Sequence, residues 1–488
     1  MNLFKRILSI VLVATFMLSA FASCANKDNN NTKRPAATGG AVTDASGNVV
    51  FEEADFNGEE FKILYYGETS KDFYDRYIWS EGFTGEAIGD AVKERNQLVE
   101  DKYNVVITAE ECGPMGEATN RIQAGQVDFN LIYERGVRCP GAALDGMLYD
   151  FHELNYVNFD QSYWVPSAID GLTVADRMFV ATNMITMNSL SWANIYYFNK
   201  MIMDELQLTY PYDYVDQKNW TYDVVLDMVT KAEYDVNGDG IMGTEDRFGG
   251  ISGDEIIQGM CDAPLYEVVD DEYKIVTFTE GMVAAYNTYK SKCDAIEYVD
   301  WEDYVEGQDI SGFGSQFIAA RFLSFGEDHQ LFMGGAASID MTREFVDMKN
   351  DYGIVPRPTK NAGDEFVTGV DYCAPMFAVP VSVKDADMTG MILEYMAYES
   401  ERLLLPAYYE TTIKTKRMQD TRDYTMLDII RGSITYDWTG IYLYAGYKIN
   451  AMRPAMLESG NFASVAKKYG PAAQKEIDDI ISTLEGIG

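Results

Sequence analysis

Hydrophobic and polar positions follow two periods in the first third of the chain, and the periods alternate. Runs of β-rich residues predict strands at 61–66, 105–109 and 129–133. Between them, apolar residues recur at helical spacing over 86–103 and around 117–124, where Gly125 is expected to end the second helix. The order strand, helix, strand, helix, strand predicts right-handed crossovers and a parallel sheet.

The rest of the chain mixes both periods without an internal repeat. A strand at 192–198 is expected to run into a helix at 199–206, and a further helix at 220–232 has Thr221 as its expected N-cap. Later strands are expected at 336–339, 352–355 and 377–383, and later helices at 388–400, 424–431 and 472–484. The pattern therefore predicts an α/β protein whose last hundred residues are mostly helical.

The N-terminus has the layout of a secretory signal. Lys5 and Arg6 precede the apolar stretch 7–22, and this stretch ends at small residues before Cys24. The cysteine stands where bacterial lipoprotein signals place the residue that receives a lipid, although Phe21 stands where leucine is usual. An ordinary signal cleaved near Ser23 and a short membrane anchor are the alternatives, but about 16 apolar residues are few for a spanning helix.

A polar tether is expected between this signal and the folded part. Residues 25–48 are rich in Asn, Lys, Thr and Gly, and such a segment buries too little apolar surface to offset the entropy of ordering it. We therefore expect a signal peptide at 1–23 and a disordered tether at 24–51. A lipid on Cys24 would hold the protein at the outer face of the bacterial cell membrane.

Composition excludes some functions. The 488 residues include 39 basic and 77 acidic ones, for a net charge of −38, which repels nucleic acid and anionic lipid. No later apolar run reaches the length of a membrane span. Aromatic residues make up 13%, led by 34 Tyr, which suits either stacking on ligands or a large aromatic core. Five scattered cysteines follow Cys24, and their spacing fits no metal knuckle or dense disulfide framework.

Several stretches together resemble one known family, the extracellular solute-binding proteins of ABC transporters in their carbohydrate-type branch (family 1). The stretches that carry the resemblance, in order, are Ile122-Gln123-Ala124-Gly125-Gln126-Val127-Asp128-Phe129, Tyr196-Tyr197-Phe198-Asn199-Lys200, Asn219-Trp220-Thr221-Tyr222-Asp223, Gly334-Gly335-Ala336-Ala337-Ser338 and Tyr352-Gly353-Ile354-Val355-Pro356. Each is weak alone, but their joint order is fairly specific from about residue 61 to 409. Ser338 departs from the common methionine.

The resemblance implies a fold of two α/β lobes joined by a hinge, each a mixed, mostly parallel sheet flanked by helices. The first lobe would be 52–186 with 332–380, and the second 187–331 with 381–488. It also implies a membrane-anchored, monomeric receptor that closes around a sugar or oligosaccharide and delivers it to ABC permease subunits. A peptide or another polar metabolite stays open as the ligand.

An acidic loop matches the twelve-residue calcium pattern. Oxygen ligands alternate along residues 235–246, Gly240 permits the sharp turn, and a carboxylate closes the loop. The expected ligands are Asp235, Asn237, Asp239, the carbonyl of Ile241, and Asp246. The last is Asp where an EF-hand has bidentate Glu, and a solvated Asn/Gly turn is the alternative. We expect a structural Ca²⁺ ion.

Ligand-binding residues are expected in loops after strands, because ligands of open parallel sheets bind beyond the carboxyl ends of the strands. Sugar recognition needs aromatic faces and polar groups in the plane of the hydroxyls. The candidates are Trp79, Glu134, Arg135, Asn188, Trp192, Asp340, Arg343, Asp371, Tyr372 and Trp438. The structural alternatives are core packing for Trp79 and Trp192, a surface ion pair for Glu134 and Arg135, and helix capping for Asp340 and Arg343. Trp438, beside Tyr436 and Asp437, is expected to close the cleft from the second lobe.

An enzyme is the rival interpretation, for example a secreted lipoprotein glycoside hydrolase. With 77 acidic residues, carboxylate pairs occur by chance and carry no information. The chain has only His152 and His329, and it contains no Gly-x-Ser-x-Gly elbow, His-Glu-x-x-His helix or phosphate-binding loop. We therefore expect a binding protein that is not an enzyme, with a surface carbohydrate-binding lipoprotein as a further alternative.

Overall fold

The computed structural model describes residues 40–44, 49–66, 77–80, 82–298, 304–310, 316–334, 339, 345, 348–415, 420–444 and 447–487. The expected signal and Cys24 lie outside the described residues, and so do Asp340, Arg343 and residues 336–338 of the strand predicted at 336–339. The described residues all belong to the compact unit Ala37–Gly488.

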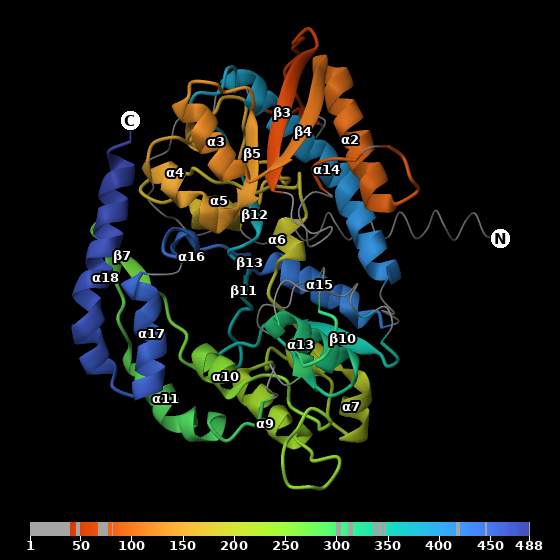
Figure 1. Ribbon diagram of the computed structural model, residues 1–488, viewed down its shortest axis with the longest axis vertical. Coiled ribbons are helices and arrows are strands. Elements are labelled where there is room, and N and C mark those ends of the chain that lie inside the picture. Colours follow the sequence, from red (N-terminus) through yellow and green to blue (C-terminus); the bar gives the residue numbers. More distant parts are fainter. Residues whose placement is uncertain are drawn as a thin grey trace, which may run out of the picture. The chain divides into compact units, whose positions relative to one another are not determined.

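The first sheet has four strands in the order β12-β5-β3-β4 (Figure 1). Strand β3 (Glu59–Tyr66) pairs in parallel with β4 (Val105–Cys112) and with β5 (Leu131–Arg135). Strand β12 (Pro375–Ala378) is antiparallel to β5. The sheet is mostly parallel, as the alternation of periods predicts, and a strand from much later in the chain forms its edge.

Two crossover helices join these parallel strands. Helix α2 (Ala87–Tyr103) begins after Glu86, whose carboxylate accepts the N–H groups of Ile88 and Gly89, and it ends at Asn104 in the left-handed conformation. Helix α3 (Pro114–Gln123) packs beside β5 and β3. The chain then turns at Gly125, which has a φ of +68° that favours glycine.

The second sheet has three strands in the order β10-β6-β9. Strand β6 (Ile195–Asn199) lies in the middle and pairs antiparallel with both β10 (Tyr352–Pro356) and β9 (Phe332–Met333). The expectation of a mostly parallel sheet is therefore wrong for these described pairings. Both β9 and β10 run antiparallel to β6, and the spacing of hydrophobic residues does not indicate the direction of a strand.

Helices make up most of the remaining structure. They are α4 (Pro140–Leu144), α5 (Pro166–Leu172), α6 (Asn188–Ser191), α7 (Lys200–Glu205), α8 (Pro211–Asp216), α9 (Tyr222–Ala232), α10 (Gly253–Met260), α11 (Glu280–Cys293), α13 (Gln316–Gly326), α14 (Ala386–Thr415), α15 (Arg422–Gly432), α16 (Trp438–Tyr442), α17 (Lys448–Ser459) and α18 (Phe462–Glu485). The short 3₁₀ turns η2 (Gly136–Arg138) and η3 (Phe151–Glu153) also occur. The small strands are β1 (Val42–Thr43), β2 (Val49–Val50), β7 (Tyr266–Val269), β8 (Glu272–Ile275), β11 (Thr368–Gly369) and β13 (Ile434–Thr435). Thr221 caps α9, as predicted.

Each large sheet has its own hydrophobic core. The first core surrounds β3, β4, β5 and β12, and the second core surrounds β6, β9 and β10. Strand pairing places 332–333 and 352–356 with the second sheet, whereas the predicted division gives them to the first lobe. They belong with β6 because their buried faces pack in the second core. The remaining lobe boundaries stay predictions.

Two long helices contribute to both cores. Val99 and Tyr103 of α2 pack in the first core, whereas Ile88 and Val92 pack in the second. Helix α14 packs along α2 and also enters both cores, with Ala397 in the first and Leu404 and Tyr408 in the second, and Pro406 lies within its second-core part. At their contact lies Arg95, fully buried. None of the described helices has the length and apolar character needed to cross a membrane.

Candidate functional site

The carboxyl ends of β3 and β5 carry an aromatic ring flanked by two cations. Tyr66 is the last residue of β3, and the guanidinium carbons of Arg135 and Arg138 lie 4.7 and 4.9 Å from the centre of its ring. Both arginines come from the end of β5 and the turn η2 that follows it. Such cation–π contacts hold the ring and the guanidinium groups in fixed relative positions.

Glu134 lies beneath this group rather than in it. Its carboxylate is buried, accepts the backbone N–H of Arg135 at 2.8 Å, and lies 3.9 Å from a guanidinium nitrogen of Arg138. Burial raises the pKa of Glu134, although these hydrogen bonds and charges oppose the shift. The predicted partner, Arg135, instead covers Tyr66. Glu134 therefore positions Arg138 from below.

Two exposed tyrosines form the most accessible aromatic surface of the region, called here the tyrosine pair. The rings of Tyr372 and Tyr444 lie 6.4 Å apart and meet edge to face, and each residue is 45% exposed. Behind Tyr372 lies Gly440, where an added Cβ would stand 2.0 Å from a ring carbon. The Tyr372 ring therefore packs against the backbone of Gly440 on one side and is accessible to solvent on the other.

The loop that carries Tyr372 is anchored to the first sheet. Asp371 accepts the backbone N–H of Cys373 at 2.7 Å, and the carbonyl of Tyr372 accepts the N–H of Val137 at 3.3 Å. This second bond connects the tyrosine to the turn that bears Arg138. The structure therefore brings together the predicted residues Arg135, Asp371 and Tyr372.

A second polar cluster surrounds the ends of β6 and β10. The hydroxyl of Tyr196 donates to Glu255 at 2.6 Å, and Glu255 lies 3.9 Å from a guanidinium nitrogen of Arg321. Arg357 follows β10 directly, and its Nε donates to the hydroxyl of Tyr222 at 2.6 Å. This cluster is built on the second core, because Tyr196 and Tyr222 are buried there.

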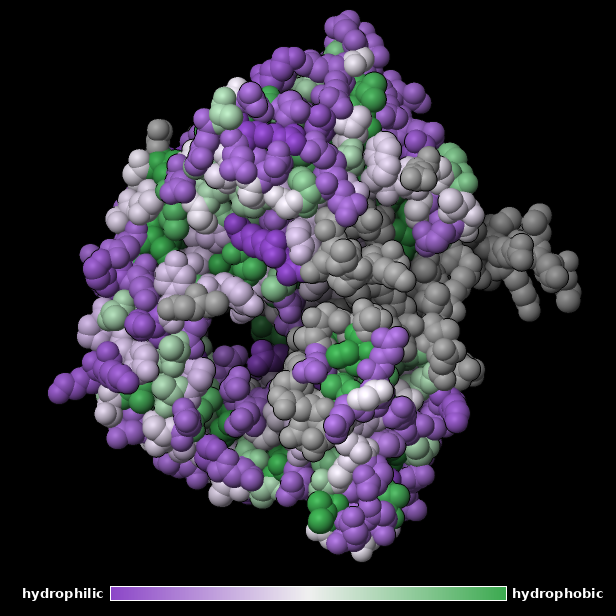
Figure 2. All heavy atoms as spheres, viewed as in Figure 1, coloured by the Kyte–Doolittle hydropathy of each residue, from purple (hydrophilic) through white to green (hydrophobic). Residues whose placement is uncertain are grey.

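The two clusters are electrostatically connected through Tyr372. Burial and the charge of Asp437 raise the pKa of this phenol, and the opposite charge of Arg357 lowers it. Figure 2 shows an opening in the region that α10, α16 and β11 surround in Figure 1. The loops next to these elements carry Asp262, Asp437 and Tyr372. The elements around this hollow therefore carry, in their adjoining loops, aromatic and charged residues of the kind that bind a polar ligand.

The other predicted ligand residues lie elsewhere or deeper. Asn188 is buried and donates to the Tyr133 hydroxyl at 2.6 Å and to the Pro375 carbonyl at 2.8 Å, so it joins β5 to β12. Trp79 is half-buried against the first core with the Lys93 ammonium 5.8 Å from its ring. Trp192 is half-buried against the second core, and its carbonyl accepts the N–H of Asp371.

Trp438 differs from its expected place. It was predicted to close the cleft from the second lobe, but its indole is 1% exposed and lies in the first core against Tyr266, Tyr273 and Tyr442. An indole enclosed in this way presents no face to a ligand. The neighbouring Asp437 caps α16 by accepting the N–H of Thr439 at 2.9 Å.

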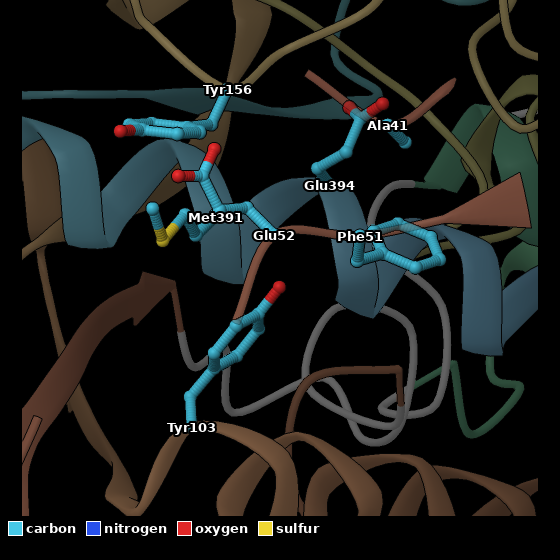
Figure 3. Close-up of a pocket in the computed structure, with 7 residues that line it drawn as sticks. All are labelled: Ala41, Phe51, Glu52, Tyr103, Tyr156, Met391 and Glu394. Carbon is cyan, nitrogen blue, oxygen red and sulfur yellow. The ribbon is translucent and has the colours of Figure 1, made fainter. Parts of the chain in front are cut away.

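A small cavity between α14 and the first strands is not a ligand site. Figure 3 shows its lining residues, which are Ala41, Phe51, Glu52, Tyr103, Tyr156, Met391 and Glu394. Its volume of about 10 Å³ has room for about one water molecule. We therefore assign it no role in binding of a sugar-sized solute.

The loop 235–246 is stabilised by its own backbone. Asp235 accepts the N–H groups of Gly238 and Gly240 at 2.7 and 2.8 Å, and Asp239 accepts that of Ile241 at 2.8 Å. Buried Asp246 accepts from Gly243 and Val236, and these bonds lower its pKa. Asn237 accepts the N–H of Asp239 at 2.8 Å. Among the described residues, no three Asp, Glu, His or Cys side chains are grouped as metal ligands, and calcium binding stays a prediction.

Several residues of the site were missed from sequence. The missed residues lie at or just after the ends of elements. They are Tyr66 at the end of β3, Arg138 at the end of η2, Arg357 directly after β10 and Tyr444 shortly after α16. Tyr66 and Arg357 stand at the carboxyl ends of predicted strands, so the same rule that selected Arg135 would have found them. Tyr444 carried no signal, because it follows a one-turn helix from a distant part of the chain.

Comparison with known proteins identifies the fold. Neither a protein-family model nor a curated protein matches the sequence. Among solved structures, a cyclo/maltodextrin-binding protein complexed with maltotetraose has a TM-score of 0.51 at 10% identity, covering 89% of this chain and 98% of that one. UspC from M. tuberculosis has a TM-score of 0.52 at 12% identity, covering 86% of this chain and 100% of that one. The chain therefore has the fold of these two proteins.

Proposed function

We propose that this protein is the substrate-binding receptor of an ABC importer and captures a carbohydrate or a similar polar solute between two lobes. The observation that carries the proposal is the tyrosine pair, which stands beside charged groups from both sheets. Aromatic rings stack on the apolar C–H faces of sugars, while charged and polar groups bind the hydroxyls. The shared fold with a maltodextrin-binding protein supports the same function.

The receptor acts by holding the solute without changing it. Affinity comes from enclosure and stacking, and release to permease subunits requires a partner that favours the open form. Cys24 would carry the lipid that anchors the protein outside the cell, with the polar tether between anchor and fold. Replacing Cys24 with serine in the full chain should move the protein from the membrane fraction to the soluble fraction, and an unchanged distribution would contradict the anchor.

The solute is best sought with a panel of oligosaccharides. A ligand that binds only the folded state raises the melting temperature by mass action, and calorimetry then gives its Kd. Tyr372→Ala is expected to weaken binding of the best saccharide by roughly tenfold or more, since a stacked ring contributes about 1.5 kcal/mol or more. Gly440→Val should weaken it as well, because its side chain would displace the ring of Tyr372.

The matched control is Tyr424→Ala. Tyr424 is 38% exposed on α15 and lies in neither polar cluster, so its loss should leave Kd unchanged. Equal affinity of Tyr372→Ala and the natural chain would remove the tyrosine pair from the site. Release of shorter saccharides during incubation would instead favour the glycoside hydrolase interpretation.

We further propose that the loop 235–246 binds Ca²⁺ as a structural ion. Extracellular loops of this kind bind with a Kd of roughly 10⁻⁴ to 10⁻³ M. Calcium at tenfold over Kd should stabilise the fold by about 1.4 kcal/mol and raise its melting temperature by roughly 2 °C. Asp239→Asn should lose this response, whereas Asp271→Asn in the β7–β8 turn should keep it. A melting temperature that stays constant up to 10 mM Ca²⁺ would reject the ion.

A further inference from the structure

Arg357 is an arginine with a fixed orientation. Its Nε donates to the Tyr222 hydroxyl at 2.6 Å, and its guanidinium carbon lies 5.8 Å from the centre of the Tyr222 ring. Tyr222 is 2% exposed and begins α9, so it cannot move without disturbing the second core. One edge of the guanidinium is therefore held by the protein, while Arg357 itself is half-buried.

The terminal nitrogens of Arg357 have no carboxylate within ion-pair distance among the described residues. Several other arginines of this acidic chain do have such partners. Arg121, for example, contacts Glu110, Glu117 and Asp128. Partial burial of a cation without a counter-ion costs free energy of folding unless another group compensates its charge. The guanidinium group of Arg357 is thus a fork of N–H donors that is held in one orientation and can bind a ligand.

The position of this fork is at the edge of the proposed binding site. The charge of Arg357 acts on the phenol of Tyr372, one member of the tyrosine pair. It follows β10 at the carboxyl end of a strand of the second sheet, whereas Tyr372 is anchored to the first sheet. The ring of Tyr222, which holds Arg357, lies against Gly259 of α10, and the ring of Tyr372 lies against Gly440 of α16. Both helices border the hollow in Figure 2, so a ligand stacked on Tyr372 would bring its polar edge towards Arg357.

The guanidinium group of Arg357 favours one class of ligand over others. Two parallel N–H donors match the two oxygens of a carboxylate, whereas a neutral sugar hydroxyl engages only one of them. Asp262, Asp371 and Asp437 act on the same groups, and their negative charges repel a dianion, such as a phosphate monoester, more strongly than a single carboxylate. We propose that the solute is an acidic saccharide whose carboxylate pairs with Arg357. This inference rests on the proposed receptor function and narrows its substrate class.

The test compares matched pairs of probes by calorimetry on the full chain. Uronate-containing oligosaccharides are each measured against the same oligosaccharide with its carboxyl groups reduced to alcohols, and against a sulfated counterpart. The acid is expected to bind at least tenfold more tightly than its reduced partner, as charged hydrogen bonds usually contribute that much or more. Arg357→Gln should lower this preference for the acid by tenfold to a hundredfold.

Variants separate recognition from folding. Arg357→Lys keeps the charge but not the fork, so it should retain only part of the preference, and Arg402→Gln on α14 should retain all of it. Should Arg357→Gln fail to fold, the lysine variant alone decides. Equal binding of acid and reduced partner, or tighter binding of the sulfated counterpart, overturns the inference while the receptor function stands. Absence of binding by every saccharide would overturn both.

Discussion

Replacing Arg95 with methionine is expected to lower the free energy of unfolding by about 3–5 kcal/mol. Arg95 is fully buried, and its guanidinium donates to the carbonyls of Tyr77 and Ile185 at 2.9 and 2.8 Å and to that of Ile78 at 3.3 Å. It also bonds Ser400 of α14. Methionine fills similar space but donates nothing, so these buried carbonyls lose a donor that water cannot replace.

Urea denaturation of the full chain measures this effect. Arg95→Lys should be intermediate, because one ammonium reaches fewer of these oxygens than a planar fork does. Lys93→Met is the control on the same helix, since the Lys93 ammonium only covers the half-buried ring of Trp79 and its loss should cost about 1 kcal/mol or less. A loss below about 1 kcal/mol for Arg95→Met would mean that the two cores do not depend on this residue.

The second large effect concerns pH. Glu394 on α14 is 1% exposed and accepts the Tyr163 hydroxyl at 2.7 Å and the Trp164 indole N–H at 2.8 Å. Burial raises its pKa from 4.5 to about 7. The folded chain therefore holds this proton more tightly than the unfolded chain. Stability should fall as pH rises from about 4.5 to about 7, by about 3 kcal/mol for this group.

Glu394→Gln should remove this part of the pH dependence. The amide oxygen can accept from Trp164 while the amide nitrogen donates to the Tyr163 oxygen, so both hydrogen bonds survive. Urea denaturation at several pH values should give a flatter curve for this variant than for the natural chain. Glu458→Gln, on an exposed face of α17, should give a curve parallel to that of the natural chain. Parallel curves for Glu394→Gln would show that Glu394 does not titrate as stated.

Much of the fold was predictable because hydrophobic residues recur at the spacing of a helix or a strand over the length of each element. The helix predicted at 86–103 is observed at Ala87–Tyr103, and the strand at 61–66 lies within Glu59–Tyr66. Helix α2 has one buried and one exposed face, which is what its helical spacing encodes. Strand β3 is instead an apolar run with consecutive residues buried on both of its faces. The predicted fold class is confirmed by the sheets and by the solved structures that share the fold.

What the sequence did not reveal depends on distant contacts. The antiparallel pairing of β6 with β10 joins residues about 150 positions apart, and period alone does not indicate strand direction. The tyrosine pair joins Tyr372 to Tyr444, and only the absence of a side chain at Gly440 allows the ring to lie there. Trp438 illustrates the opposite error, since an aromatic residue next to Tyr436 and Asp437 looks exposed in sequence but is enclosed in the first core.

Helix α14 constrains how the protein can change shape. Residues 388–397 of this helix pack in the first core, and Leu404, Leu405 and Tyr408 pack in the second, so Pro406 lies near the start of the part that packs in the second core. Proline has no N–H to donate to the carbonyl of Arg402, so a bend there breaks no backbone hydrogen bond, whereas a bend elsewhere in the helix does. A movement of one core relative to the other would therefore bend α14 most easily over residues 402–406, at the edge of the second core.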